Sequence, residues 1–153
     1  SVGPLFADVP TVTERLGNNL RQTSGKIEFT PGDLDDSATN VHKTITHAYQ
    51  IFPNGVIITS PWYISVMILM PNAPGKTTVD YFMLTLNPAD KDKGRELYTK
   101  SYEMVLNVFG NEDFKAAAEC YAGLASGALK DVVYSGLEST IPMYYEILDS
   151  YLD

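Results

Sequence analysis

The middle of the chain carries the feature that most constrains its fold: a block of four strand-forming segments joined by very short connections. The segments are rich in Ile, Val, Thr, Tyr and Phe, which favour β-strands. They span residues 44–52, 56–60, 62–70 and 77–86. They are separated by Pro53-Asn54-Gly55, by Pro61 and by residues 71–75. Connections this short cannot hold a parallel crossover, so the block predicts an antiparallel sheet in which each strand pairs with the next.

The third of these segments, residues 62–70, is apolar on both of its faces. One face carries Ile64, Val66, Ile68 and Met70, and the other carries Tyr63, Met67 and Leu69. A strand that met water on one side would alternate apolar and polar residues. We therefore expect one face to meet a helix, and the other to meet more protein or to line a cavity.

Helical periodicity replaces the strand pattern after the sheet. A first helix is expected from about residue 91 to 109, because apolar residues recur at helical spacing on one face. Gly110 is expected to close this helix, and Asn111 to cap a second helix that runs to about residue 125. Ser126-Gly127 should end the second helix.

These segments give the organisation of the chain. We interpret residues 1–153 as a single or partial domain with a polar lead-in (1–44), an antiparallel sheet (45–87) and helices (91–152). Ser139 or Thr140 can cap the last helix, with Pro142 near its first position. An antiparallel sheet followed by long helices predicts the α+β class.

The polar lead-in offers little core-forming material. Residues 12–20 form a short amphipathic piece that Thr11 or Thr13 can cap, and only residues 26–30 hint at a strand. Such a segment would suit packing on protein that is not part of this chain.

The charge and the cysteine count exclude several classes of protein. The net charge is −8 and only 11 Lys and Arg are present, so we expect neither a nucleic-acid nor an anionic-membrane partner. The single cysteine, Cys120, can form no internal disulfide, which suits a reducing cytoplasm. The first residues lack the features of a signal peptide, and the longest apolar run, residues 64–70, is too short to span a bilayer. The sequence therefore predicts a soluble, cytoplasmic protein.

Asp113 most invites a functional interpretation. It lies four residues before Ala117 and seven before Cys120, so its carboxylate lies along the edge of an apolar helical face. A carboxylate held there needs an arginine, backbone donors or a metal as its partner. The alternative is structural, since Asp113 beside Glu112 can complement the helix dipole. Glu119 fits a solvated helix residue, and Cys120 fits a small buried one.

His42 and His47 are the only histidines, and they stand in an H-x4-H arrangement. With Asp113 they could form a two-histidine, one-carboxylate iron site with open positions. The segment around them is polar and strand-like, however, and an offset of five on a strand sends two rings to opposite faces. We therefore favour two partly exposed histidines beside a strand over a metal site.

Several stretches, taken in order, resemble one known family. They are Phe52-Pro53-Asn54, residues 70–77 (MPNAPGKT), residues 79–82 (VDYF), Glu112-Asp113-Phe114, Glu119, residues 123–127 (GLASG) and residues 135–138 (SGLE). Over roughly residues 45–148, their order and spacing resemble the C-terminal part of the catalytic domain of a Rieske-type ring-hydroxylating oxygenase α subunit.

The resemblance implies a fold, a reaction and a metal. The fold would be a helix grip of the Bet v 1-like or START-like superfamily, with an antiparallel sheet packed on a long C-terminal helix. The protein would be an oxidoreductase that hydroxylates an aromatic or other apolar substrate with O2. Members of the family bind a mononuclear Fe(II) through two histidines and one aspartate, and the aspartate matches Asp113.

The resemblance also implies partners outside this chain. The histidine pair and a Rieske 2Fe-2S cluster would belong to the parent protein, so residues 1–153 alone are not expected to be active. A reductase or ferredoxin would donate electrons, and α subunits of this family are commonly homotrimeric.

Two other functions remain open. The cavity between sheet and helix could hold an apolar ligand without iron, with Asp113 a helix-start carboxylate. Alternatively, the acidic, tyrosine-rich residues 139–153 could form a subunit contact. If a cavity exists, we expect Tyr121 to line it. The other wall would be either the Ile64, Val66 and Ile68 face or the Met67 and Leu69 face.

Overall fold

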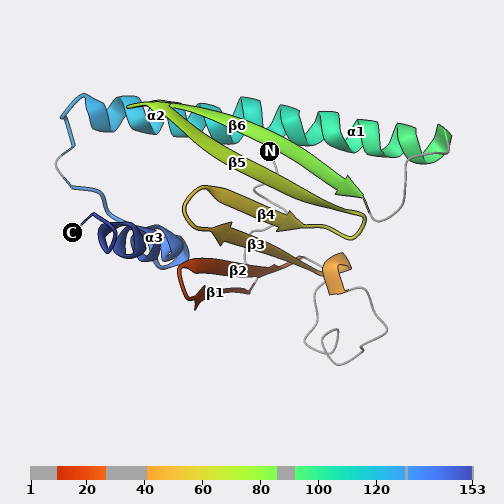
Figure 1. Cartoon of the computed structure of the whole chain (residues 1–153), viewed down its shortest axis with the longest axis horizontal. Helices are drawn as coiled ribbons and strands as arrows, with labels where there is room; N and C mark the ends of the chain where they lie inside the picture. The colour runs from red at the N-terminus through yellow and green to blue at the C-terminus, as the bar shows by residue number, and fades with distance from the viewer. Residues whose placement is uncertain (1–9, 27–40, 86–91, 130, 153) are drawn as a thin grey trace.

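The computed structural model of the chain describes residues 10–26, 41–85, 92–129 and 131–152. One six-stranded antiparallel sheet contains the strands in their chain order (Figure 1). The strands are β1 (Thr11–Leu16), β2 (Asn19–Gly25), β3 (Ile45–Ile51), β4 (Gly55–Thr59), β5 (Tyr63–Ala73) and β6 (Lys76–Thr85). The helices are α1 (Asp92–Val108), α2 (Phe114–Ala125) and α3 (Thr140–Asp149), with the short turns η3 (Val41–Lys43), η4 (Phe109–Asp113) and η5 (Gly136–Glu138). The predicted α+β class, with an antiparallel sheet and a long C-terminal helix, is confirmed.

The four predicted strands are all present as β3 to β6, and each pairs with the next. β5 and β6 are the longest pair and extend past the predicted end of the third segment, with a register shift between Pro71 and Ala73. The proline and glycine connections therefore marked the sheet correctly, because a turn too short for a crossover fixes the direction of the next strand.

The N-terminal part adds two strands that the sequence did not predict. Residues 12–20 form most of the β1–β2 hairpin and not a capped amphipathic piece. Gly17 has a φ of 65° in the two-residue turn, a conformation that glycine adopts without strain. The strand expected at residues 26–30 lies, apart from Lys26, outside the described residues.

The two faces of the sheet differ. Alternate residues of a strand point to opposite sides. We call the side that carries the cross-strand pair Leu69–Val79 the inner face, because the helices lie over it. The outer face carries Ile64, Phe82 and Leu84, which are 40%, 52% and 54% exposed. On β5 and β6 the outer face is therefore apolar and accessible among the described residues.

α1, η4 and α2 form one uninterrupted helix, so the prediction that Gly110 closes a helix and Asn111 caps the next is wrong. Gly110 does not adopt a positive φ. The Asn111 side-chain amide donates to Oδ1 of Asn107 at 2.7 Å, one turn earlier. η4 is a π turn, in which the N–H of Phe114 donates to the carbonyl of Phe109, five residues before it. Gly110 and Asn111, which were expected to separate two helices, thus belong to one wide turn within a continuous helix.

The long helix ends where predicted. The N–H of Ser126 donates to the carbonyl of Ala122 at 3.1 Å, and Gly127 follows with a φ of 71°. A glycine in this left-handed conformation is a common helix terminator. None of the helices in the described part of the chain combines the length and the apolar character that crossing a membrane would require.

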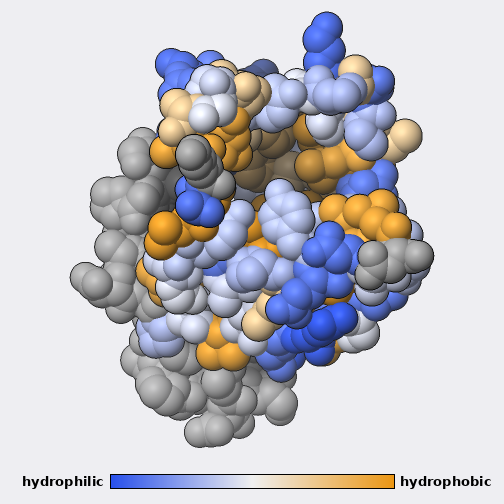
Figure 2. Space-filling model, turned by 90° about the vertical axis from the view of Figure 1, so that its left-hand side faces the viewer, coloured by the Kyte–Doolittle hydropathy of each residue, from blue (hydrophilic) through white to orange (hydrophobic). Residues whose placement is uncertain are grey.

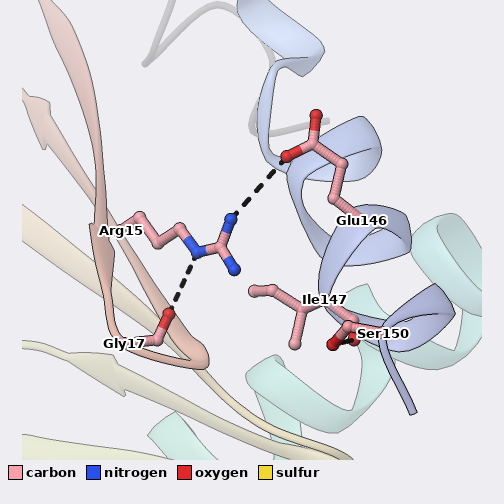
Figure 3. Close-up of polar contacts among 5 residues, drawn as sticks. All are labelled: Arg15, Gly17, Glu146, Ile147 and Ser150. Carbon is pink, nitrogen blue, oxygen red and sulfur yellow. Dashed lines mark hydrogen bonds and ion pairs between the residues drawn. The ribbon is translucent and has the colours of Figure 1, made fainter.

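The C-terminal helix α3 is held against the β1–β2 hairpin. Ile147 is fully buried and points from α3 toward the hairpin (Figure 3), and Leu20 of β2 is only 1% exposed. The Arg15 guanidinium forms an ion pair with Glu146 at 3.7 Å, while its Nε donates to the carbonyl of Gly17 at 3.1 Å (Figure 3). One side of α3 is therefore buried within the chain itself.

Aromatic contacts extend this attachment to the turn between β3 and β4. The ring of Phe52 stacks on Tyr151 with centroids 5.0 Å apart, and the Tyr144 hydroxyl donates to the carbonyl of Pro53 at 2.7 Å. Part of the surface that residues 139–153 could offer to another subunit is thus already used inside the chain.

The start of α3 is as predicted, but the predicted cap at Ser139 or Thr140 is wrong. Ser139 has a helical φ of −56° and makes no side-chain cap hydrogen bond. Ser135 instead caps the preceding turn η5, and its N–H donates to Oε2 of Glu138 at 2.8 Å. Hydrogen bonds from the backbone and then the side chain of Ser135 lower the pKa of Glu138. The chain enters α3 directly from this turn, so the capping hydrogen bonds are made at Ser135 and not at Ser139 or Thr140.

Candidate functional site

A groove of about 530 Å³ lies between α2 and the inner face of β5 and β6. It is lined by Leu69, Gly75, Thr77, Val79, Phe114, Ala117, Ala118 and Tyr121, none of which is charged. From the side where α2 and α3 lie, the surface is hollowed and its walls are largely apolar (Figure 2). Its volume is typical of small-molecule sites, which range over about 300–1,000 Å³. The groove is therefore suited to an apolar small molecule.

The groove exists because the long helix contacts the sheet through large rings and leaves a gap beside small side chains. Tyr81 of β6 contacts the rings of Tyr102 and Phe109, with centroids 5.3 and 6.2 Å away. Farther along the helix, Ala117 and Ala118 face the sheet and cannot fill the space that the rings hold open. The groove therefore forms where alanines follow the aromatic residues on the side of the helix that faces the sheet.

A second hollow continues the groove toward α3. Its volume is about 310 Å³, and it shares Leu69 and Thr77 with the groove. On the α3 side it is bounded by Tyr144. The inner face of the sheet is consequently hollow from α2 across to α3.

Asp113 is the last residue of the π turn and directly precedes Phe114, which lines the groove. Its side chain is exposed and makes no hydrogen bond or ion pair within the described part of the chain. Ala117, which lines the groove, is four residues further along α2, so the two side chains project from neighbouring positions on the helix. Among the described residues, the Asp113 carboxylate is therefore exposed and unpaired on the helix that lies over the groove.

The neighbours of Asp113 do not extend this site. Glu119 is exposed and lies 4.0 Å from the Lys115 ammonium, as a solvated helix pair would. Cys120 is exposed, so the prediction of a buried cysteine is wrong. α2 stands off the sheet above the groove, and its side chains away from the groove are left uncovered.

The two histidines lie together, contrary to the prediction that they point to opposite faces. Their ring centroids are 5.4 Å apart. Nδ1 of His42 is 3.2 Å from the Thr59 hydroxyl, and Nδ1 of His47 is 2.9 Å from the Thr23 hydroxyl. The alternation argument failed because His42 lies in the turn η3 and not on the strand that carries His47.

The environment of His47 disfavours its protonated form. Burial is the largest cause of its lowered pKa, followed by the charges of His42 and Arg21, while Glu14 acts in the opposite direction. A neutral imidazole at this position is therefore favoured in the folded chain.

The structure does not bring the histidines to Asp113. His47 and Tyr49 lie on the same face of β3. Tyr49 pairs with Ile57, Ile57 with Val66, and Val66 with Phe82, so this row of residues, and His47 with it, lies on the outer face. Asp113 belongs to the helix over the inner face, so the sheet separates it from His42 and His47. The described residues contain no group of three His, Cys, Asp or Glu side chains placed to hold a metal. The described residues therefore do not assemble the two-histidine, one-carboxylate arrangement.

The sequence model for the ring hydroxylating alpha subunit catalytic domain matches residues 14–153. The chain belongs to this family. No curated protein and no solved structure matched it. Ring-hydroxylating α subunits are oxidoreductases that generally depend on non-haem iron, act with a reductase or ferredoxin, and form oligomers. Membership confirms the resemblance seen in the sequence and does not favour an iron-free binding module.

Sequence reasoning found some groove residues of this ring-hydroxylating α subunit and missed others. Tyr121 and the Met67 and Leu69 face were named, and Leu69 and Tyr121 do line the groove. The alternative face with Ile64 is the outer one. Gly75 and Val79 were missed, although the Pro-Gly turn and the pairing of Val79 opposite Leu69 could have indicated them.

Proposed function

We propose that this chain is the C-terminal, substrate-binding part of an oxygenase catalytic domain with a helix-grip fold. The protein that contains it hydroxylates an aromatic or other apolar substrate with O2. The observation that carries the proposal is the uncharged groove beneath α2 in a chain of this family, with the exposed Asp113 next to the groove residue Phe114.

In this proposal Asp113 is one ligand of a mononuclear Fe(II). His42 and His47 are the only histidines among the 153 residues and lie on the outer face, so histidine ligands would come from elsewhere in the protein. When bound, the iron would supply the activation of dioxygen. A carboxylate is a suitable donor for such a metal, and sites of this kind keep open positions.

The groove would bind and orient the substrate. Its apolar walls exclude water from an apolar ligand, and the rings of Phe114 and Tyr121 offer faces on which a planar molecule can pack. Thr77 is the polar side chain on the sheet side of the groove. The substrate would thus be held by shape and burial, with its reactive edge toward Asp113.

The remaining partners follow from the family. Electrons would reach the site from a reductase or ferredoxin through a Rieske 2Fe-2S cluster. This chain has one cysteine and cannot hold such a cluster by itself. We propose a homo-oligomer, as a trimer, in the cytoplasm.

The test is the iron content of the intact protein with Asp113→Ala. We expect bound iron to fall at least tenfold, while stability changes by about 1 kcal/mol or less because the side chain is exposed. Glu119→Ala is the matched control, since it removes an exposed carboxylate from the same helix. Full iron occupancy in the Asp113 variant would contradict the proposed role.

A further inference from the structure

The groove is bounded along the helix by two aromatic residues. Phe114 and Tyr121 both line it and are seven residues apart on α2, so their Cα atoms are separated by about 10 Å along the helix axis. Ala117 and Ala118 lie between them on the same side. Along the helix axis the groove is therefore a short space with small residues between two rings, and across the strands it continues into the hollow toward α3.

The ring at the Phe114 end is part of a packed cluster. Phe114 stacks on Phe109, with centroids 5.9 Å apart and planes at 25°, and Phe109 contacts Tyr81. On a regular α-helix an offset of five residues would separate two side chains by about 140°, so this stacking depends on the π turn. This end of the groove is held by rings from both the helix and the sheet.

The other end along the helix is bounded by Tyr121. Gly75 lies in the β5–β6 turn with a φ of 73°, and a Cβ added there would collide with the Tyr121 ring. The ring therefore lies directly against the turn and fills the passage between α2 and the hairpin. Because Tyr121 is 49% exposed, truncating it would open the groove to solvent and would not remove a buried core side chain.

We infer that Tyr121 is a specificity-determining residue of the groove and that its ring sets the longest apolar ligand the groove accepts along the helix axis. This inference rests on the proposed function, because it takes the groove as the substrate site. Molecules that fit between Phe114 and Tyr121 bind, and longer ones meet the Tyr121 ring.

The test measures the affinity of the intact protein for a homologous series of alkylbenzenes. In the unmodified protein, affinity should rise with chain length and then fall sharply at a cut-off. Tyr121→Ala should move the cut-off to longer members, with at least a tenfold gain for the first member that the unmodified protein rejects. Tyr121→Phe keeps the ring and should leave the cut-off unchanged, whereas Tyr121→Trp should shorten it.

The possible outcomes distinguish the inference about Tyr121 from the proposed function. An unchanged cut-off in both the Ala and the Trp variants, with binding retained, would overturn the inference and leave the proposed function standing. A Phe variant that behaves like the Ala variant would also overturn it, because the hydroxyl and not the ring would then set the limit. Binding of no alkylbenzene by the unmodified protein would overturn the proposed function and this inference with it. Tyr121→Leu keeps apolar bulk on α2 and serves as a second truncation if the Ala variant fails to fold.

Discussion

Two helices lie over the inner face of the sheet, and they pack against it in opposite ways. α3 buries Ile147 completely and adds the Arg15–Glu146 ion pair to the β1–β2 hairpin. α2 has no buried residue, and Leu124 near its end is 46% exposed. A groove separates α2 from the strands beneath it.

The difference shows where stability and binding are located in this chain. Close packing at the hairpin end supplies the burial that holds the fold, since apolar burial is the dominant stabilising term. The α2 end keeps its apolar surface uncovered, which disfavours the folded chain alone but leaves that surface for a ligand. We therefore expect substitutions at the α3 end to lower the free energy of unfolding, and substitutions at the α2 end to change it little.

The largest expected effect is that of Ile147→Ala. Removing a fully buried side chain should lower the free energy of unfolding by about 2–5 kcal/mol, because transfer and cavity terms add. Leu124→Ala on α2 should cost less than about 1 kcal/mol, because surface substitutions rarely cost more. Urea unfolding of the intact protein measures both. Equal losses of unfolding free energy in the two variants would contradict the claim that α3 packs more closely than α2.

A smaller effect is expected at Gly110, where the long helix passes through its π turn. An added Cβ would meet nothing within 4 Å, so Gly110→Ala should stabilise the protein by up to about 1 kcal/mol. Gly127→Ala is the matched control, and it should destabilise by about 1–2 kcal/mol because Gly127 has a φ of 71°. Loss of stability in the Gly110 variant would instead support two separate helices.

The smallest effect concerns the outer face, which neither helix covers. His47 has a pKa below its usual 6.5 because it is partly buried and lies near His42. The unfolded chain therefore takes up this proton more readily, and stability should fall as the pH drops below about 6.5. His47→Gln should flatten this dependence between pH 7.5 and 5.5 in urea unfolding. An equally steep dependence in the variant would assign it to other groups.

Much of the sheet could be predicted from the sequence because its signals are local. Pro53, Pro61 and Gly75 lie between strands whose connections are too short for any other pairing. The β1–β2 hairpin was missed because its strands are short and largely polar, and pairing with β3 decides the conformation of β2. Gly110 and Asn111 were recognised as irregular positions in the helical segment, but they form a π turn and not a helix end.

The site was predictable only in part for a related reason. Asp113 and Tyr121 could be named from helical spacing and from resemblance to the family. Gly75 could be placed in a turn from the sequence, but its contact with the Tyr121 ring could not. The proximity of His42 to His47 depends on a turn that no strand pattern describes. At the site, the contacts between elements were therefore out of reach of the sequence.

The most direct test of the central claim is the location of iron in crystals of the intact protein. Anomalous diffraction at the iron edge marks the metal independently of the protein atoms. The proposed function predicts a peak within coordination distance of the Asp113 carboxylate, on the side of the inner face of the sheet. A peak beside His42 and His47 on the outer face, or one distant from Asp113, would contradict it.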